Sequence, residues 1–299
     1  MKILIQILLN IAFVVYSHEQ NTSIPVVLWH GMGDSCCNPL SLGRLMKVMK
    51  ANMPNNSYIK SIQIGDDMGQ DIENSFKMNV NLQVQNACKQ IAKEKNLANG
   101  YNAIGFSQGS QFLRAVAQRC PNPPMLNLIS IGGQHQGVYG LPHCFYPQHK
   151  WCDYLRKLLN YGAYWGWVQN HFVQAEYWHD PLKEQDYIKY SVFLADINNE
   201  REMNYIYRKN LMQLKNFVLV MFESDSMMIP KESAWFGFYT PGQNVNITKL
   251  EDSVLYQVDR IGLKRLNEEN KLHFISLPGD HLRFTEEWFV KEIIQKYLV

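Results

Sequence analysis

The chain of 299 residues is 46% hydrophobic and 19% charged, a composition typical of a globular protein with one large domain and an insertion, or with two domains. Its formal net charge of +2 is near neutral and no block of like charges occurs, which argues against a nucleic-acid-binding role. After the N-terminal segment no stretch is apolar over the length that crosses a bilayer, so we expect no transmembrane anchor.

The first 17 residues are typical of a secretory signal peptide. Lys2 precedes a short apolar run, and Ser17 is a small residue after which cleavage could follow. The run is too short for a membrane span and ends in the polar segment 18–21; the alternative is a buried N-terminal strand. Secretion is also compatible with N-glycans, for which the sequence offers three acceptor sites, at Asn21, Asn55 and Asn246.

An even number of cysteines favours disulfides in the oxidising compartment that a signal peptide implies. The six residues are Cys36, Cys37, Cys88, Cys120, Cys144 and Cys152. We expect three bridges, among fifteen pairings that the residues alone leave open. The spacing does not match a zinc site, because the adjacent pair Cys36 and Cys37 cannot easily give two ligands to one metal. We therefore expect no metal and no other cofactor.

The first predicted core strand is the apolar run 24–29, which suits a strand covered on both faces of a parallel sheet. A Gly-rich loop, 30–35, follows it directly. Residues 58–64 alternate in the manner of a strand, and apolar residues recur at helical spacing over 80–92. Strands that alternate with helices predict a parallel sheet.

The pentapeptide Gly105-Phe106-Ser107-Gln108-Gly109 lies between a predicted strand, 102–104, and a predicted helix, 111–117. Gly-x-Ser-x-Gly in this context is typical of the nucleophile elbow of α/β-hydrolases, where glycines leave room for a sharp turn. We predict that Ser107 is the nucleophile. In this fold the loop after the first strand and the residue after the nucleophile give backbone N–H groups to the oxyanion hole, which predicts Met32 and Gln108.

The alternation of strands and helices is interrupted after the next predicted strand, 125–131. Between about Gly137 and Leu214 the sequence has little strand character and many aromatic residues. We expect a mostly helical insertion over the active-site face, and its apolar character suggests a lipid-like substrate group. Strands return at 216–222 and 272–277, before a closing helix, 286–297. The predicted organisation is a hydrolase core in two parts, 18–136 and 215–299, with the insertion 137–214 between them.

An α/β-hydrolase presents its triad in the chain order serine, acid, histidine, each after a strand. Ser107, Asp225 and His281 satisfy that order, with His281 as general base and Asp225 orienting its ring. Other histidines, His30, His135 and His179, also lie near suggestive residues, but only His281 follows the final strand. The alternative acids are Glu223, which we expect at the strand's edge, and Asp280, which is poorly placed to reach the ring of its neighbour.

With these residues assigned, the chain resembles the palmitoyl-protein thioesterase family over nearly its whole mature length. The most specific run is Trp29-His30-Gly31-Met32-Gly33-Asp34-Ser35-Cys36-Cys37, within 28–39. The other matching segments are 100–109, 131–137, 174–181, 235–239 and 279–282. Two departures are Ser110, where the family usually has another glycine, and the segment 145–151.

The resemblance implies an α/β-hydrolase fold and the triad Ser107, Asp225 and His281. It implies the bridges Cys36–Cys37, Cys88–Cys120 and Cys144–Cys152, and an acyl groove in the insertion. It also implies an enzyme that removes long-chain acyl groups from cysteine, with S-palmitoylated proteins or peptides as substrates and a fatty acid as product. We expect a monomer, in the lysosome or secreted. An oxygen-ester lipase, an acyl-CoA thioesterase and a non-catalytic lipid binder are the alternative functions; the binder would be expected to have lost a triad member, and none is missing.

Overall fold

The computed structural model describes residues 23–140 and 157–299. Several sequence predictions fall outside the described residues: the signal peptide, the acceptor site at Asn21, the departure at 145–151, and the pair Cys144 and Cys152.

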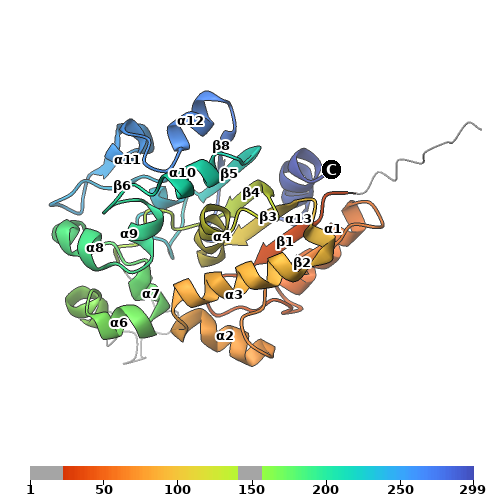
Figure 1. Cartoon of the computed structure of the whole chain (residues 1–299), viewed down its shortest axis with the longest axis horizontal. Helices are drawn as coiled ribbons and strands as arrows, with labels where there is room; N and C mark the ends of the chain where they lie inside the picture. The colour runs from red at the N-terminus through yellow and green to blue at the C-terminus, as the bar shows by residue number, and fades with distance from the viewer. Residues whose placement is uncertain (1–22, 141–156) are drawn as a thin grey trace, which may run out of the picture.

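A six-stranded sheet forms the centre of the molecule, with the order β2-β1-β3-β4-β5-β8 and every neighbouring pair parallel (Figure 1). The strands are β1 (Val26–Trp29), β2 (Ile59–Ser61), β3 (Tyr101–Phe106), β4 (Met125–Ile131), β5 (Asn216–Phe222) and β8 (Leu272–Leu277). The predicted class, an α/β-hydrolase fold with a mostly parallel sheet, is confirmed. Strands β1 and β3 are buried along their full length, which explains their continuous apolar sequences.

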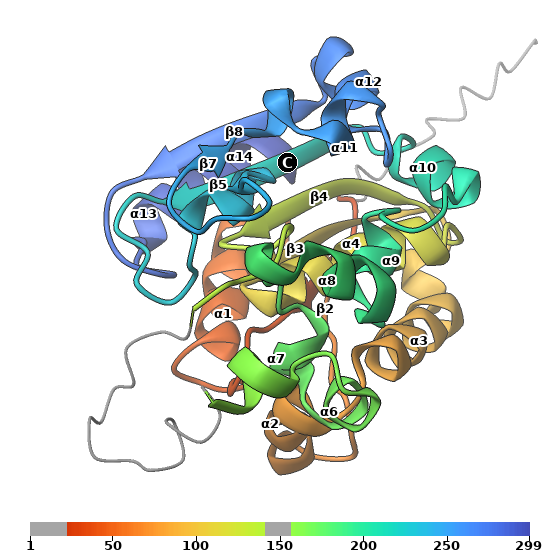
Figure 2. The same ribbon diagram turned by 90° about the vertical axis from the view of Figure 1, so that its left-hand side faces the viewer.

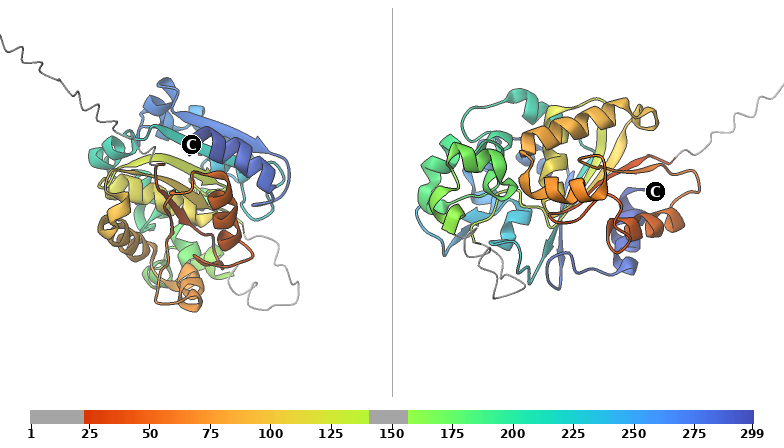
Figure 3. Two further views of the ribbon diagram at one scale, coloured as in Figure 1. Left: turned by 90° about the vertical axis from the view of Figure 1, so that its right-hand side faces the viewer. Right: turned by 90° about the horizontal axis from the view of Figure 1, so that it is seen from below.

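Helices cover both faces of the sheet, and side chains that alternate along each strand supply two separate cores. Val26 and Leu28 join one cluster, with Phe289 and Ile293 of the C-terminal helical segment. Helix α1 (Leu42–Asn52) packs beside that segment, as the left view of Figure 3 shows. Val27 and Trp29 face the other cluster, with residues of α3 (Val80–Lys93) and α4 (Gln108–Arg119).

Every regular element that the structure describes between β4 and β5 is helical, with loops and turns between the helices, apart from an isolated bridge between Val138 and Trp178. Its elements are α6 (Gly166–His171), α7 (Val173–Glu176), η2 (Pro181–Lys183), α8 (Glu184–Tyr190), α9 (Leu194–Ile197) and α10 (Tyr205–Leu211). Figure 2 shows α6 and α7 beside α2 (Met68–Lys77). Trp178, Tyr187 and Phe193 are buried in the same cluster as Phe112 of α4, so these aromatic residues belong to the core.

Some elements differ from the sequence predictions. The short antiparallel pair β6 (Phe238–Tyr239) and β7 (Ile247–Thr248) was not predicted, because two-residue strands leave no periodic pattern. The closing helix is divided into α13 (Glu286–Trp288), the π-helical η5 (Phe289–Ile294) and α14 (Gln295–Tyr297). The remaining elements are η1 (Lys95–Leu97), η3 (Lys231–Trp235), η4 (Leu250–Asp252), α11 (Val254–Gln257) and α12 (Leu263–Glu268).

Two disulfides lie in the described residues, Cys36–Cys37 and Cys88–Cys120. The second joins α3 to the residue that caps the C-terminus of α4, across a sequence separation of 32. It therefore crosslinks the helix that begins directly after Ser107.

We expect the double substitution Cys88→Ala and Cys120→Ala to lower the free energy of unfolding by about 3 kcal/mol, because a loop of this length is released in the unfolded chain. Urea denaturation under non-reducing conditions, which keep the wild-type disulfide intact, measures the change. The matched control, Cys36→Ala with Cys37→Ala, opens almost no loop and should cost much less. Equal losses from the two pairs would contradict the loop-closure explanation.

Candidate active site

Ser107 lies at a sharp turn between β3 and α4, with a backbone φ of +52°. A non-glycine residue rarely adopts this conformation, and here the neighbours enforce it. A Cβ at Gly105 would lie 2.3 Å from the Cα of Ser110, and a Cβ at Gly109 only 2.4 Å from the carbonyl oxygen of Trp29. The two glycines therefore let the start of α4 approach both β3 and β1 closely.

The side chains of Ser107, His281 and Asp225 form a continuous hydrogen-bonded chain. Ser107 Oγ lies 3.0 Å from His281 Nε2, and His281 Nδ1 lies 2.6 Å from Asp225 Oδ2. The Asp225 side chain is fully buried, and its Oδ1 accepts hydrogen bonds from the backbone N–H groups of Met227 (3.0 Å) and Met228 (2.8 Å). The carboxylate is thereby held by one oxygen and directs the other at the ring, which sets the imidazole orientation.

The two alternative acids do not contact the imidazole ring. Asp280 Oδ1 accepts from the backbone N–H groups of His281 (2.7 Å) and Ser226 (2.8 Å), so it ties the histidine loop to the loop of Asp225. These bonds, that of Ser226 first, lower the pKa of Asp280. Glu223 is exposed and accepts a hydrogen bond from the Ser276 hydroxyl at 2.7 Å.

A glycine in the loop after β4 makes room for the imidazole. Gly132 has a φ of +64°, and a Cβ there would lie 3.1 Å from His281 Cε1. This loop connects β4 with the helical insertion, so the position of the histidine ring depends on backbone far from it in sequence.

The loop after β1 borders the nucleophile. A Cβ at Gly31 would lie 3.0 Å from the Cβ of Ser107, and the next residue, Met32, is 37% exposed. Gln108 is the first residue of α4, where backbone N–H groups have no partner within the helix. The structure thus brings the segment of Met32 close to Ser107 and to the first residue of α4, Gln108.

The buried carboxylate of Asp71 holds this loop in place. It accepts from the backbone N–H groups of Ile64 (2.7 Å) and Cys36 (2.8 Å), and it lies 3.0 Å from His30 Nε2. His30 is therefore part of the support of the loop and lies apart from the triad. No sequence pattern signalled Asp71, because its three partners come together only in the fold.

The other two candidate histidines are core residues. His135 Nε2 lies 2.8 Å from Ser130 Oγ and its ring stacks on Phe236, and burial lowers its pKa well below the usual value. His179 is held between Gln136 O and Glu184 Oε2, each 2.8 Å away.

Sequence reasoning missed one side chain that contacts the nucleophile. Gln134 Nε2 donates a hydrogen bond of 3.1 Å to Ser107 Oγ, and the residue is only 7% exposed. Gln134 lies in the loop directly after β4, the neighbour of β3 in the sheet. Its place after a strand adjacent to the elbow strand is the signal that could have identified it.

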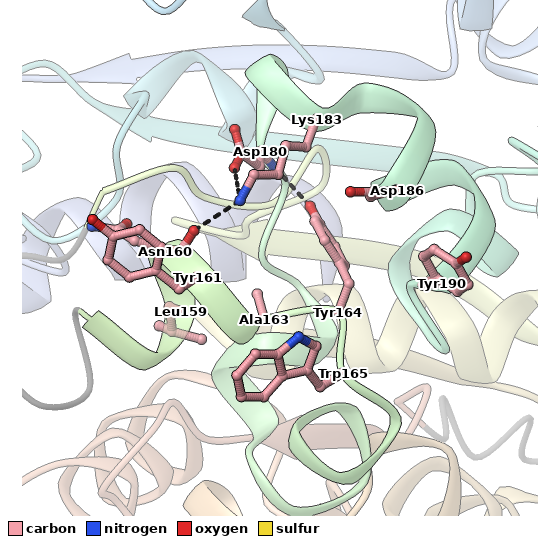
Figure 4. A pocket seen from close by; sticks show the side chains of 10 residues that line it. All are labelled: Leu159, Asn160, Tyr161, Ala163, Tyr164, Trp165, Asp180, Lys183, Asp186 and Tyr190. Carbon is pink, nitrogen blue, oxygen red and sulfur yellow. Dashed lines mark hydrogen bonds and ion pairs between the residues drawn. The ribbon is translucent and has the colours of Figure 1, made fainter.

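A pocket of about 340 Å³ lies among the insertion helices (Figure 4). Its wall combines aromatic residues such as Tyr164 and Trp165 with Asp180, Lys183 and Asp186. Lys183 Nζ bonds the carbonyl of Asn160 at 3.0 Å and pairs with Asp180 at 3.8 Å, while burial raises the pKa of Asp180. Charged groups suit a long alkyl chain poorly, and no triad residue lines this pocket, so the predicted acyl groove is not this pocket.

Residues 23–140 and 157–299 contain no group of three histidine, cysteine, aspartate or glutamate side chains arranged to hold a metal ion. Within the same ranges, none of the helices combines the length and the apolar character of a membrane span.

The chain is similar to a set of known proteins. A family model described as palmitoyl protein thioesterase matches residues 25–281. Palmitoyl-protein thioesterase 1 of Caenorhabditis elegans is 52% identical over 276 residues, which cover 92% of each chain. Palmitoyl-protein thioesterase 3 of Dictyostelium discoideum is 34% identical over 94% of this chain and 92% of its own. Lysosomal thioesterase PPT2 of Homo sapiens is 31% identical over 56% of this chain and 54% of its own.

Substitution of the three acids should separate their roles. We expect Asp225→Asn to lower kcat/KM on an activated acyl ester by about 10⁴-fold, because the imidazole loses its orienting carboxylate. Asp280→Asn should lower kcat/KM roughly tenfold, because the loops of Asp225 and His281 are then held less firmly. Glu223→Gln should leave kcat/KM near the wild-type value. Steady-state kinetics on variants with matched melting temperatures provide the measurement. A larger loss for Asp280→Asn than for Asp225→Asn would show that the acid is misassigned.

Proposed function

The chain belongs to the palmitoyl-protein thioesterase family and is a thioester hydrolase, and from this premise we propose that it removes long-chain acyl groups from protein cysteines through an acyl-enzyme on Ser107. The observation that carries the proposal is the hydrogen-bonded chain from Ser107 Oγ through the imidazole of His281 to Asp225 Oδ2. This arrangement supplies a nucleophile, a general base and a group that orients the base.

In the first half-reaction Ser107 Oγ attacks the thioester carbonyl carbon while His281 Nε2 takes the hydroxyl proton. Asp225 stabilises the imidazolium that forms. The carbon–sulfur bond then breaks, its electron pair stays on sulfur, and His281 returns a proton to the leaving cysteine. In the second half-reaction water, activated by His281, attacks the acyl carbon and the fatty acid leaves.

We assign the oxyanion hole to the backbone N–H groups of Met32 and Gln108. The close approach of Gly31 to Ser107 and the position of Gln108 as the first residue of α4 support the assignment. A helix N-terminus also contributes positive potential where the carbonyl oxygen becomes negative. The support of the first loop by Asp71 would keep its N–H in place without reorganisation during the reaction.

We propose that the insertion, 137–214, is the domain that receives the acyl chain. Its described part exposes the large aromatic side chains of Tyr161, Trp165 and Trp167, which favours contact with an apolar partner. We propose S-palmitoylated proteins or peptides as the partners, with a monomeric enzyme.

We propose the lysosome, reached through the secretory pathway, as the working compartment. The sequence prediction of a signal peptide supports this proposal, as do the exposed acceptor asparagines Asn55, in a turn, and Asn246, in a bend directly before β7. The human relative that is named a lysosomal thioesterase supports it as well.

A buried carboxyl group also favours an acidic compartment. Glu176 is fully buried, accepts one hydrogen bond from the backbone N–H of Val80 at 2.9 Å, and has its pKa raised well above the usual value by burial. The folded state therefore prefers the protonated form. The stability from this preference is complete below the ordinary glutamate pKa and is lost as the pH rises through the folded-state pKa.

The Glu176→Gln variant, which cannot ionise, should gain melting temperature relative to wild type as the pH rises from about 4.5 to 7.5. The amide keeps an acceptor for Val80 and removes the charge that burial opposes. Thermal melts of both proteins across this range measure the difference, with Glu73→Gln on the exposed face of α2 as the control. A constant difference across the range would contradict the prediction.

The substrate assignment is tested by wild type and Ser107→Ala on a palmitoyl thioester and the matched oxygen ester. We expect wild type to prefer the thioester and Ser107→Ala to lose at least about 10⁴-fold in kcat, as removal of a triad serine does. Preference for the oxygen ester would leave the fold and the triad intact but overturn the proposed substrate. Unchanged activity in Ser107→Ala would overturn the nucleophile.

A further inference from the structure

The nucleophilic oxygen has a second partner besides the imidazole. Ser107 Oγ lies 3.0 Å from His281 Nε2 and 3.1 Å from Gln134 Nε2. Because the hydroxyl proton must point to the histidine for base catalysis, the group on its other side must be a donor. The Gln134 amide satisfies that condition when its NH₂ faces Ser107. Its Oε1 is then buried without a hydrogen-bond partner among the described residues, a cost that a purely structural glutamine would avoid.

The backbone around Gln134 is tightly constrained. A Cβ at Gly133 would lie 2.4 Å from Ser130 Oγ and 2.5 Å from Ser110 Cβ, so the loop rests directly on the end of β4 and the start of α4. On the other side of Gln134, the N–H of Gln136 donates to Ser233 Oγ at 3.0 Å. The backbone that carries the Gln134 amide is therefore held in place, which limits the rearrangement needed when charge develops on Ser107 Oγ.

Gln134 and the proposed oxyanion donor Met32 approach Ser107 from opposite sides. The sheet order places β1, which leads to Met32, on one side of β3, and β4, which leads to Gln134, on the other. We place the substrate carbonyl oxygen on the side of Met32, whereas the Gln134 amide donates to the serine oxygen itself.

We propose that Gln134 is a catalytic residue that stabilises Ser107 Oγ as the leaving group when the acyl-enzyme is hydrolysed. The proposal rests on the acyl-enzyme mechanism given above. In acylation the leaving group is a cysteine thiolate, whose conjugate acid has a pKa of about 8.5. In deacylation the leaving group is the serine oxygen, a far stronger base, so this second half-reaction needs more help from the enzyme.

In deacylation, water displaces the serine oxygen from the acyl carbon. The oxygen of water forms a bond to the acyl carbon while one water proton passes to His281 Nε2. As the tetrahedral intermediate collapses, the bond between the acyl carbon and Ser107 Oγ breaks and its electron pair returns to Oγ. The proton on His281 moves to Oγ, and the fatty acid departs. The Gln134 N–H donates to Oγ while the negative charge builds, which is when such a bond contributes most.

The test compares wild type with Gln134→Met, which keeps the length of the side chain and removes the donor. We expect kcat on a palmitoyl thioester to fall by about 10- to 100-fold while kcat/KM, which reports acylation, changes by less than about threefold. KM should fall with kcat. Rapid mixing should show a burst of released thiol, close to one per enzyme, and intact-mass analysis should find the acyl group on Ser107.

Two further variants make the result specific. Gln136→Met changes another buried glutamine of the same loop, whose side chain has no hydrogen bond within the described residues, and should give no burst. Gln134→Glu carries a donor only when protonated, so its deacylation rate relative to wild type should rise as the pH falls through the titration of the new carboxyl group.

Equal losses in kcat and kcat/KM for Gln134→Met would overturn the proposal in favour of a structural role. Wild-type kinetics in that variant would overturn it as well, and so would a Gln134→Glu pH profile identical to that of wild type. These outcomes differ from a failure of the proposed function, which would appear as a wild-type enzyme that does not turn over the thioester or as an active Ser107→Ala variant.

Discussion

The close approach of helix α4 to strand β1 is the constraint on which the site depends. Gly109 lies against the carbonyl oxygens of Trp29 and His30, at distances that no side chain could tolerate. With α4 this close, the chain has to reverse within one residue after β3, and Ser107 takes the strained conformation that results. The same approach brings the loop after β1 beside the nucleophile. One packing contact thus sets the direction of the serine and its distance from the proposed oxyanion donors.

The parts of the site that were predictable from sequence are those whose signal lies within a short, continuous segment. Gly105 and Gly109 around Ser107, and apolar runs followed by Asp225 and His281, are signals within single segments. These segments meet because the carboxyl ends of parallel strands share one edge of the sheet. The chain order of strands and turns therefore sufficed for the three residues that now form a hydrogen-bonded chain.

Asp71 could not be predicted for a physical reason. Its carboxylate binds the backbone N–H groups of segments 7 and 35 residues away. When a side chain bonds to the backbone of another segment, no particular residue type is required at the partner position, because nearly every residue offers the same N–H. The sequence therefore contains no signal for such a pair. Asp280 shows the opposite case. Its place beside His281 suggested a catalytic alternative, whereas its bonds to two backbone N–H groups make it a brace between loops.

Buried side-chain hydrogen bonds join the insertion to α4, the helix that follows the nucleophile. No charge pattern in the sequence predicts them. Arg114 of α4 is fully buried and donates to the carbonyl of Ile197 (3.1 Å) and to Asn198 Oδ1 (2.8 Å), and burial lowers its pKa to about 9. Its planar guanidinium donates mainly to carbonyl oxygens, so these hydrogen bonds fix its orientation although the acceptors carry no negative charge. Arg114 also lowers the pKa of His135, although less than burial does.

The neutral ring of His135 and the protonated carboxyl of Glu176 act in opposite directions on stability. The contribution of a buried histidine with a lowered pKa is complete above the ordinary histidine pKa and declines as the pH falls towards the folded-state value, whereas the contribution of Glu176 grows over the same fall. The two buried groups therefore give the stability opposite dependences on pH.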